Sequence, residues 1–289
     1  QPVYFDLRLG TKCNLACRMC SPVSSSLIEK ELDEHFELFQ PHGFHMEDYA
    51  YAKQNVTTDA HIDQVFDYIE TTKQPITLKF TGGEPFLNQR IPGFVQKLID
   101  SGRAKDIRIT FITNLTTVKR SLLEDLKNNF KNFNLTISME GIKTEYEYVR
   151  YPSTWFKFQK NFDMIQELGI KTNICYTGNS LTIGNFVRWL DWVFKYGVDW
   201  DFNPVIGPSH YNISCLPAEY KKQIIRDINE WRSRHPGYEW LSELDNAIGW
   251  LSKPQNIQDW QDLKKDTGIK DSIRQQSIHR SLPKLATYF

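Results

Sequence analysis

The segment ITLKFTGGEP (residues 76–85) decides the fold class of this 289-residue chain. Ile76 to Phe80 form a short run of strand-forming residues, and the glycines that follow end it. A helix is predicted from there to residue 101, with Gly102 as its C-terminal stop. A second strand is predicted over residues 107–113. A strand, a helix and another strand in this order predict one βαβ unit with two parallel strands.

The same alternation continues on both sides of this unit. The predicted strands are residues 3–9, 76–80, 107–113, 133–138, 170–177 and 198–204. The predicted helices are residues 24–39, 59–71, the segment ending at 101, 118–129, 155–168 and 183–196. An irregular insertion is expected between the first two helices, at residues 40–57. Because six units are fewer than the eight of a closed barrel, the expected fold is α/β, a partial (β/α)6 TIM-like barrel with right-handed crossovers.

The pattern becomes helical after about residue 210. One helix is predicted over about 216–231, and residues 236–289 are rich in Trp and in polar residues. We therefore expect a partial-barrel core, residues 1–210, and a helical C-terminal extension, residues 211–289, that packs on the barrel.

Composition narrows the class of protein. The formal net charge is zero, with 35 basic and 35 acidic residues, so no general affinity for polyanions such as nucleic acids is indicated. No stretch approaches the length of an apolar membrane span. Three of the five cysteines lie within eight residues, a pattern that suits metal ligation in a reducing compartment better than a disulfide framework. The expected location is therefore cytoplasmic.

The cysteine cluster has the spacing Cys13-x3-Cys17-x2-Cys20. Thiolates are the usual ligands of iron–sulfur clusters, and three of them on one cubane leave the fourth iron open to another ligand. A zinc site is the alternative, but structural zinc usually takes four protein ligands, and the spacing is not the usual paired C-x2-C.

Further polar motifs follow the other predicted strands. Gly82-Gly83-Glu84 comes after the second strand, Thr113-Asn114 ends the third, and Ser138-Met139-Glu140 ends the fourth. Since chemistry in parallel sheets gathers at the carboxyl ends of the strands, we expect these motifs and the cysteines to form one site.

Two of these motifs together resemble the radical S-adenosylmethionine (SAM) superfamily. The cysteine spacing is similar to the family's cluster motif, and Gly82-Gly83-Glu84-Pro85 is similar to its SAM-binding turn. The resemblance implies a [4Fe–4S] cluster on Cys13, Cys17 and Cys20, reductive cleavage of SAM to a 5′-deoxyadenosyl radical, and hydrogen abstraction from a substrate. One position departs from the pattern: Met19 replaces the usual aromatic residue, and its adaptable apolar side chain can still pack beside the adenine.

The resemblance also implies roles for single residues in SAM binding. Glycine lets the backbone approach the ligand, and the Glu84 carboxylate would hold the SAM amino group. The other implied SAM contacts are Thr113 and Asn114 near the cofactor, Ser138 and Glu140 at the ribose and Arg150 at the carboxylate. Asn179, after the fifth strand, could also reach SAM, and an ordinary loop cap is the alternative. Glu140 stands where the family has Asp, and a surface charge is the alternative interpretation of Arg150.

The tail contains Cys215-Leu-Pro-Ala-Glu-Tyr-Lys and, near its end, Asp271-x2-Arg274 and Leu282-Pro283. These motifs resemble the tail of twitch-type radical SAM proteins. Only Cys175 and Cys215 lie outside the core motif, too few for a second [4Fe–4S] cluster, so one cluster is expected. Tyr176, near the end of the fifth strand, is a candidate catalytic hydrogen donor or pocket residue. His42 and His45, in the insertion, could line the site mouth, although exposed loop positions are the alternative.

Three function classes remain open at this point. An enzyme acting on a peptide or a small molecule is favoured, with a reducing partner such as flavodoxin or ferredoxin. An RNA-modifying enzyme would need a basic surface near the barrel mouth, and the sequence shows only modest Lys/Arg clusters such as Lys264-Lys265. A non-catalytic zinc or iron–sulfur scaffold is disfavoured by the joint presence of the three cysteines and Glu84.

Overall fold

The computed structural model describes residues 3–8, 10–54 and 59–289. Its six strands form a single parallel sheet in the order β1-β2-β3-β4-β5-β6, which is also their order in the chain. The strands are β1 (Tyr4–Arg8), β2 (Ile76–Thr81), β3 (Ile107–Thr113), β4 (Asn132–Ser138), β5 (Lys171–Gly178) and β6 (Asp199–Pro204). The expected α/β partial barrel is therefore confirmed.

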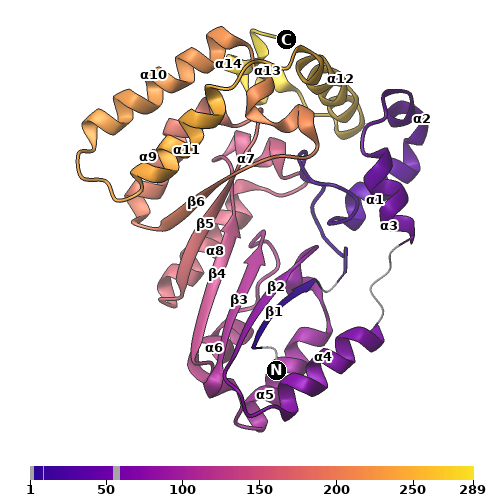
Figure 1. The fold of residues 1–289 in the computed structure, drawn as a ribbon, viewed down its shortest axis with the longest axis vertical. Coiled ribbons are helices and arrows are strands. Elements are labelled where there is room, and N and C mark those ends of the chain that lie inside the picture. Colours follow the sequence, from indigo (N-terminus) through magenta and orange to yellow (C-terminus); the bar gives the residue numbers. More distant parts are fainter. Residues whose placement is uncertain (1–2, 9, 55–58) are drawn as a thin grey trace.

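Helices connect the strands and continue beyond the sheet (Figure 1). Those before β5 are α1 (Ser26–Glu34), α2 (Phe36–Phe39), α3 (Met46–Gln54), α4 (Asp59–Thr71), α5 (Arg90–Asp100), α6 (Arg120–Asn129), α7 (Thr144–Val149) and α8 (Trp155–Glu167). Those after β5 are α9 (Phe186–Tyr196), α10 (Ala218–Arg234), α11 (Leu241–Leu251), α12 (Ile257–Arg274), α13 (Ile278–Ser281) and α14 (Pro283–Ala286).

The two faces of the sheet differ in polarity. In β2, Ile76, Leu78 and Phe80 are buried and apolar, while the alternate residues, Thr77 and Lys79 among them, are partly exposed. The same alternation runs through β4 and β5. Strands of a sheet covered on both faces usually form continuous apolar runs, so the alternation indicates one face packed on helices and one partly open to solvent. The second face is the inside of the partial barrel.

The described strand ends differ from their predicted positions by at most one residue, and the larger differences lie in the helices. The helix predicted over residues 24–39 is interrupted at His35, whose φ of −132° separates α1 from α2. The expected irregular insertion contains a helix, α3, and α7 follows β4 without having been predicted. The predictions at residue 9 and at residues 55–57 lie outside the described residues.

The helices after residue 210 share the core of the barrel. One continuous cluster of buried apolar residues includes Phe80 and Ile137 of the sheet, Trp231 of α10 and Leu263 of α12. In the described part of the chain, no helix combines the length and apolarity needed to cross a bilayer.

Phe111 on β3 offers a test of the helix-facing core. Its ring stacks on those of Phe80 and Phe86, each with ring centroids 4.8 Å apart. Because Phe111→Ala leaves a cavity there, we expect a loss of about 3–5 kcal/mol in the free energy of unfolding, measured by urea denaturation. Phe156→Ala, at a ring that is 78% exposed, should change it by less than about 0.5 kcal/mol. Equal losses in the two variants would contradict this packing.

Candidate cofactor site

The three motif cysteines line one cavity of about 270 Å³ at the carboxyl ends of the strands. Of the residues predicted from the sequence, the cavity also gathers Gly82, Gly83, Thr113, Asn114, Ser138 and Arg150. The prediction that motifs scattered over 140 residues converge at one edge of the sheet agrees with this arrangement.

The cysteine loop is held by backbone contacts on two sides. The amides of Ala16 and Arg18 donate to the carbonyls of Tyr151 and Val149, at 2.7 and 2.8 Å. On the other side the Ser25 hydroxyl, which also caps α1, donates to the carbonyl of Leu15 at 2.6 Å. The loop therefore has a defined path between α1 and the segment after α7.

The glycine turn after β2 packs directly against this loop. Gly83 has a φ of +48°, and a Cβ placed on it would lie 2.3 Å from the carbonyl oxygen of Lys12. The next amide, that of Glu84, donates to the same carbonyl at 2.9 Å. Only glycine permits both the left-handed backbone and this close approach, so the turn holds the beginning of the cysteine loop.

Glu84 joins the ends of two neighbouring strands. Its buried carboxylate accepts hydrogen bonds from the Thr113 hydroxyl at 2.8 Å and from the Asn114 amide at 2.7 Å. Burial raises the pKa of Glu84 to about 7, although these hydrogen bonds lower it. Glu84 is not among the cavity-lining residues, so in this structure it supports the site from behind.

Arg150 and Glu140 form a buried ion pair beside the cysteines. The Arg150 Nε donates to Glu140 Oε2 at 2.7 Å, and Nη2 donates to the other carboxylate oxygen. The remaining Nη1 donates to the Sγ of Cys17 at 3.6 Å. The two-pronged pair fixes the guanidinium plane, so a positive charge is directed at a thiol of the cavity.

The chemistry of the three thiols fits metal binding. All three are free of disulfides. Burial raises the pKa of each, that of Cys20 to about 11, although the Arg150 charge lowers all three. The thiols are therefore protonated near neutral pH until a metal displaces their protons.

The number of ligands separates a cluster from a single zinc ion. Among the described residues that line the cavity, no further Cys and no His, Asp or Glu stands beside the three thiols. Structural zinc usually takes four protein ligands. Three thiolates are enough for a [4Fe–4S] cluster whose fourth iron stays open. The ligand set therefore suits three corners of a cluster.

The motif and its geometry agree with a comparison against family models, in which residues 7–193 match the description "Radical SAM superfamily". The chain belongs to the radical SAM superfamily. No curated protein matches the chain.

Solved structures share the radical SAM fold. The structure described as "Native anSMEcpe with bound AdoMet" has a TM-score of 0.54 and 18% identity, covering 83% of this chain and 62% of that one. The same protein with AdoMet and the Cp18Cys peptide has a TM-score of 0.53 and 17% identity, and the match covers 86% of this chain and 62% of that one. Streptococcus suis SuiB bound to precursor peptide SuiA has a TM-score of 0.52 and 12% identity, and the match covers 81% of this chain and 46% of that one. The chain thus spans about three fifths or less of these proteins.

Some residues predicted for a radical SAM site lie elsewhere in the structure. Tyr176 is fully buried, and its ring packs on Phe186 and Trp189. Because neighbouring strand residues face opposite sides, Thr177 lines the cavity while Tyr176 faces the helices. The structure does not bring Tyr176 to the cavity, so its suggested hydrogen-donor role has no geometric support.

Other positions also differ from their predicted surroundings. Asn179 is buried, and its side-chain oxygen accepts from the amides of Leu181 and Thr182, which is the loop-cap alternative. Neither His42 nor His45 lines the cavity. Arg8 of β1 and Thr177 of β5 line the cavity, and the sequence prediction missed both. The alternation of side chains along these two strands could have identified them.

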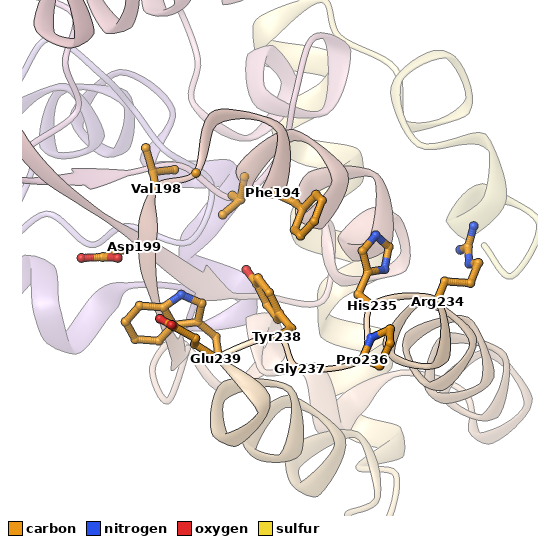
Figure 2. Close-up of a pocket in the computed structure, with 12 residues that line it drawn as sticks. Phe194, Val198, Asp199, Arg234, His235, Pro236, Gly237, Tyr238 and Glu239 are labelled. Carbon is orange, nitrogen blue, oxygen red and sulfur yellow. The ribbon is translucent and has the colours of Figure 1, made fainter.

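A larger cavity of about 500 Å³ lies away from the radical SAM motifs. Figure 2 shows Phe194 of α9 and Tyr238 among the side chains that line it, and their ring centroids lie 5.9 Å apart. Val198 and Asp199, at the start of β6, also line it. It is therefore at the amino end of a strand, and none of its lining residues belongs to the predicted site.

Gly83→Ala tests the contact between the turn and the cysteine loop. Because the added Cβ collides with a backbone carbonyl and not with a flexible side chain, we expect iron retained after anaerobic reconstitution to fall at least several-fold. Iron and sulfide per chain, with circular dichroism as a check on folding, measure this. Gly249→Ala, on α11 with open space around the added Cβ, is the matched control. Full iron content in Gly83→Ala would exclude the steric role.

The raised pKa of Glu84 predicts a pH-dependent stability. A carboxyl whose pKa is higher in the folded than in the unfolded protein stabilises the fold at low pH, and loses that contribution as pH rises through the folded pKa. The free energy of unfolding of the metal-free parent, minus that of Glu84→Gln, should therefore decrease between about pH 4.5 and pH 7. Urea titrations across this range measure the difference. A constant or increasing difference would show that Glu84 is not the titrating group.

Proposed function

We propose that this chain is a radical SAM enzyme that binds a [4Fe–4S] cluster through Cys13, Cys17 and Cys20 and uses it to cleave SAM reductively. The observation that carries the proposal is the convergence of three free thiols on a cavity whose described lining has no fourth Cys, His, Asp or Glu and whose wall includes Gly82 and Gly83. When bound, the cluster would supply the electron that breaks the sulfonium of SAM and so starts hydrogen abstraction from a substrate.

The surrounding residues would bind and orient SAM. The backbone of Gly82 and Gly83 approaches the cavity closely, and Thr113, Asn114 and Ser138 offer hydrogen-bonding side chains in its wall. Arg150 would attract the SAM carboxylate while remaining paired to Glu140. The carboxylate of Glu140 is already paired with Arg150, so Glu140 would contact the SAM ribose only if this ion pair rearranged. Glu84 would act indirectly, by holding the ends of β2 and β3 together.

Peptides and small molecules are the proposed substrate classes. Two of the similar solved structures, those of anSMEcpe with the Cp18Cys peptide and of SuiB with SuiA, contain bound peptides, which favours a peptide. We further propose one cluster and a short, twitch-like tail from residue 211, because Cys175 on β5 and Cys215 after β6 are the remaining cysteines. A flavodoxin or ferredoxin in a reducing cytoplasm is the proposed electron source.

The other function classes fit the structure less well. An RNA substrate has no support from the overall charge, since basic and acidic residues are equal in number. A zinc scaffold would usually need a fourth protein ligand, and the described residues that line the cavity include no further Cys and no His, Asp or Glu.

Formation of 5′-deoxyadenosine tests the proposed function. The protein is reconstituted anaerobically with iron and sulfide, reduced with dithionite and mixed with SAM, and the product is followed by chromatography. We expect product from the parent and none from Cys17→Ala, since one cubane corner is then without its ligand. Cys175→Ala, outside the motif, should retain the activity.

The metal content separates the outcomes of this experiment. Iron and sulfide near four each per chain support the cluster. Binding of zinc with no iron would refute the proposal, and so would product formation that survives loss of Cys17.

A further inference from the structure

Arg18 lies inside the cysteine motif, one residue after the second cysteine, and its side chain has no exposed surface. It points away from the cavity and is not one of the residues that line it. A charged side chain buried at this place needs partners, because an unpaired buried charge is costly.

The partners of the Arg18 guanidinium come from the far end of the chain. Its Nη2 donates to Asp271 Oδ1 at 2.5 Å and to Gln276 Oε1 at 2.9 Å. Its Nε donates to the Tyr148 carbonyl at 3.0 Å, and the guanidinium stacks over the Tyr148 ring at 3.8 Å from the centroid. Asp271 and Gln276 thus join the cysteine loop to the end of α12.

The backbone of Arg18 is bound by the same helix. Lys270 Nζ donates to the Arg18 carbonyl at 3.1 Å and to Asp266 Oδ2 at 2.8 Å, and it also contacts His45 Nε2 at 3.1 Å. The ammonium of Lys270 therefore occupies the position between His45 and Asp266 where a metal ion would otherwise lie. One buried lysine ties α12 to the cysteine loop and to the insertion.

The buried face of α12 is unusually polar. Asp266, Lys270 and Arg274 follow one another at four-residue intervals, and all three are buried. Arg274 forms a two-pronged ion pair with Glu31 of α1, at 2.7 Å for both bonds. Buried ion pairs add little stability compared with apolar packing, but they define geometry narrowly. This helix face is therefore better suited to holding a loop in position than to stabilising the fold.

We propose that Arg18 and the polar face of α12 form a clamp that positions the cysteine loop for its cluster, with Asp271 as the essential partner and Lys270 as the second. These are positioning residues, since they act through the backbone between Cys17 and Cys20 without touching the cavity. The role of the clamp in retaining a cluster rests on the proposed function. The role of the clamp in holding the cysteine loop does not, because the clamp consists of contacts within the protein.

Thiol labelling of the metal-free protein tests the clamp directly. The parent, Arg18→Met and Asp271→Asn are treated with N-ethylmaleimide, and labelling of each cysteine is followed by peptide mass spectrometry. Because the clamp contributes hydrogen bonds to charged groups, its loss should raise the labelling rate of buried Cys17 about tenfold or more. Asp245→Asn, which removes the acid of the exposed Arg232–Asp245 pair, is the matched control and should leave the rate unchanged.

Cys215 distinguishes local loosening from general unfolding. It is fully buried and lies outside the cysteine loop, in a short 3-10 helix after β6. Faster labelling of Cys17 with unchanged labelling of Cys215 supports the clamp. An equal rise at both cysteines, or no rise at Cys17, overturns it.

Iron release measures the same effect in the reconstituted protein. Loss of outer partners of metal ligands typically weakens metal binding on the order of 10- to 100-fold, so Arg18→Met and Asp271→Asn should release iron to a chelator at least about tenfold faster. Unchanged release rates would overturn the role in cluster retention. If the parent binds no iron while labelling still shows the clamp, the proposed function fails and the clamp stands.

Discussion

The contact between the glycine turn after β2 and the start of the cysteine loop is the constraint on which the site depends. The carbonyl of Lys12 accepts from the Glu84 amide and lies where a side chain on Gly83 would have to go. This close approach brings the loop to the carboxyl ends of the strands, where its thiols share a cavity with residues from β3 and β4. A parallel sheet provides that edge, because all its strands end on the same side.

Buried charge surrounds this constraint in an ordered way. The Arg150–Glu140 pair directs a cation at Cys17, and Arg18 on the other side of the loop is paired with Asp271. Each arginine is neutralised by its carboxylate partner, so the cysteine loop lies beside two ion pairs and not beside an unpaired charge. Preorganisation of this kind limits how far the loop can move when a charged cofactor binds.

The C-terminal helices belong to the same physical unit as the barrel. Their buried apolar residues join the sheet's core, and the polar face of α12 reaches the cysteine loop, α1 and the insertion. A division near residue 210 remains a useful description of sequence pattern. The contacts show that the segment after it also holds the cysteine loop and α1 and does not simply cover the barrel.

The sequence by itself determined the six βα units, the edge of the sheet that carries the site and the identity of the cysteine and glycine motifs. These follow from short-range periodicity and spacing, which act within a few residues of each other. Tertiary structure alone decided that Glu140 pairs with Arg150, that Tyr176 faces the helices while Thr177 faces the cavity, and that Arg18 meets Asp271, 253 residues later in the chain. Alternation along a strand places neighbouring side chains on opposite faces of the sheet, but it does not identify the face that lines the cavity. Ion pairs between distant segments leave no local sequence pattern, because their energy depends on burial that only the completed fold provides.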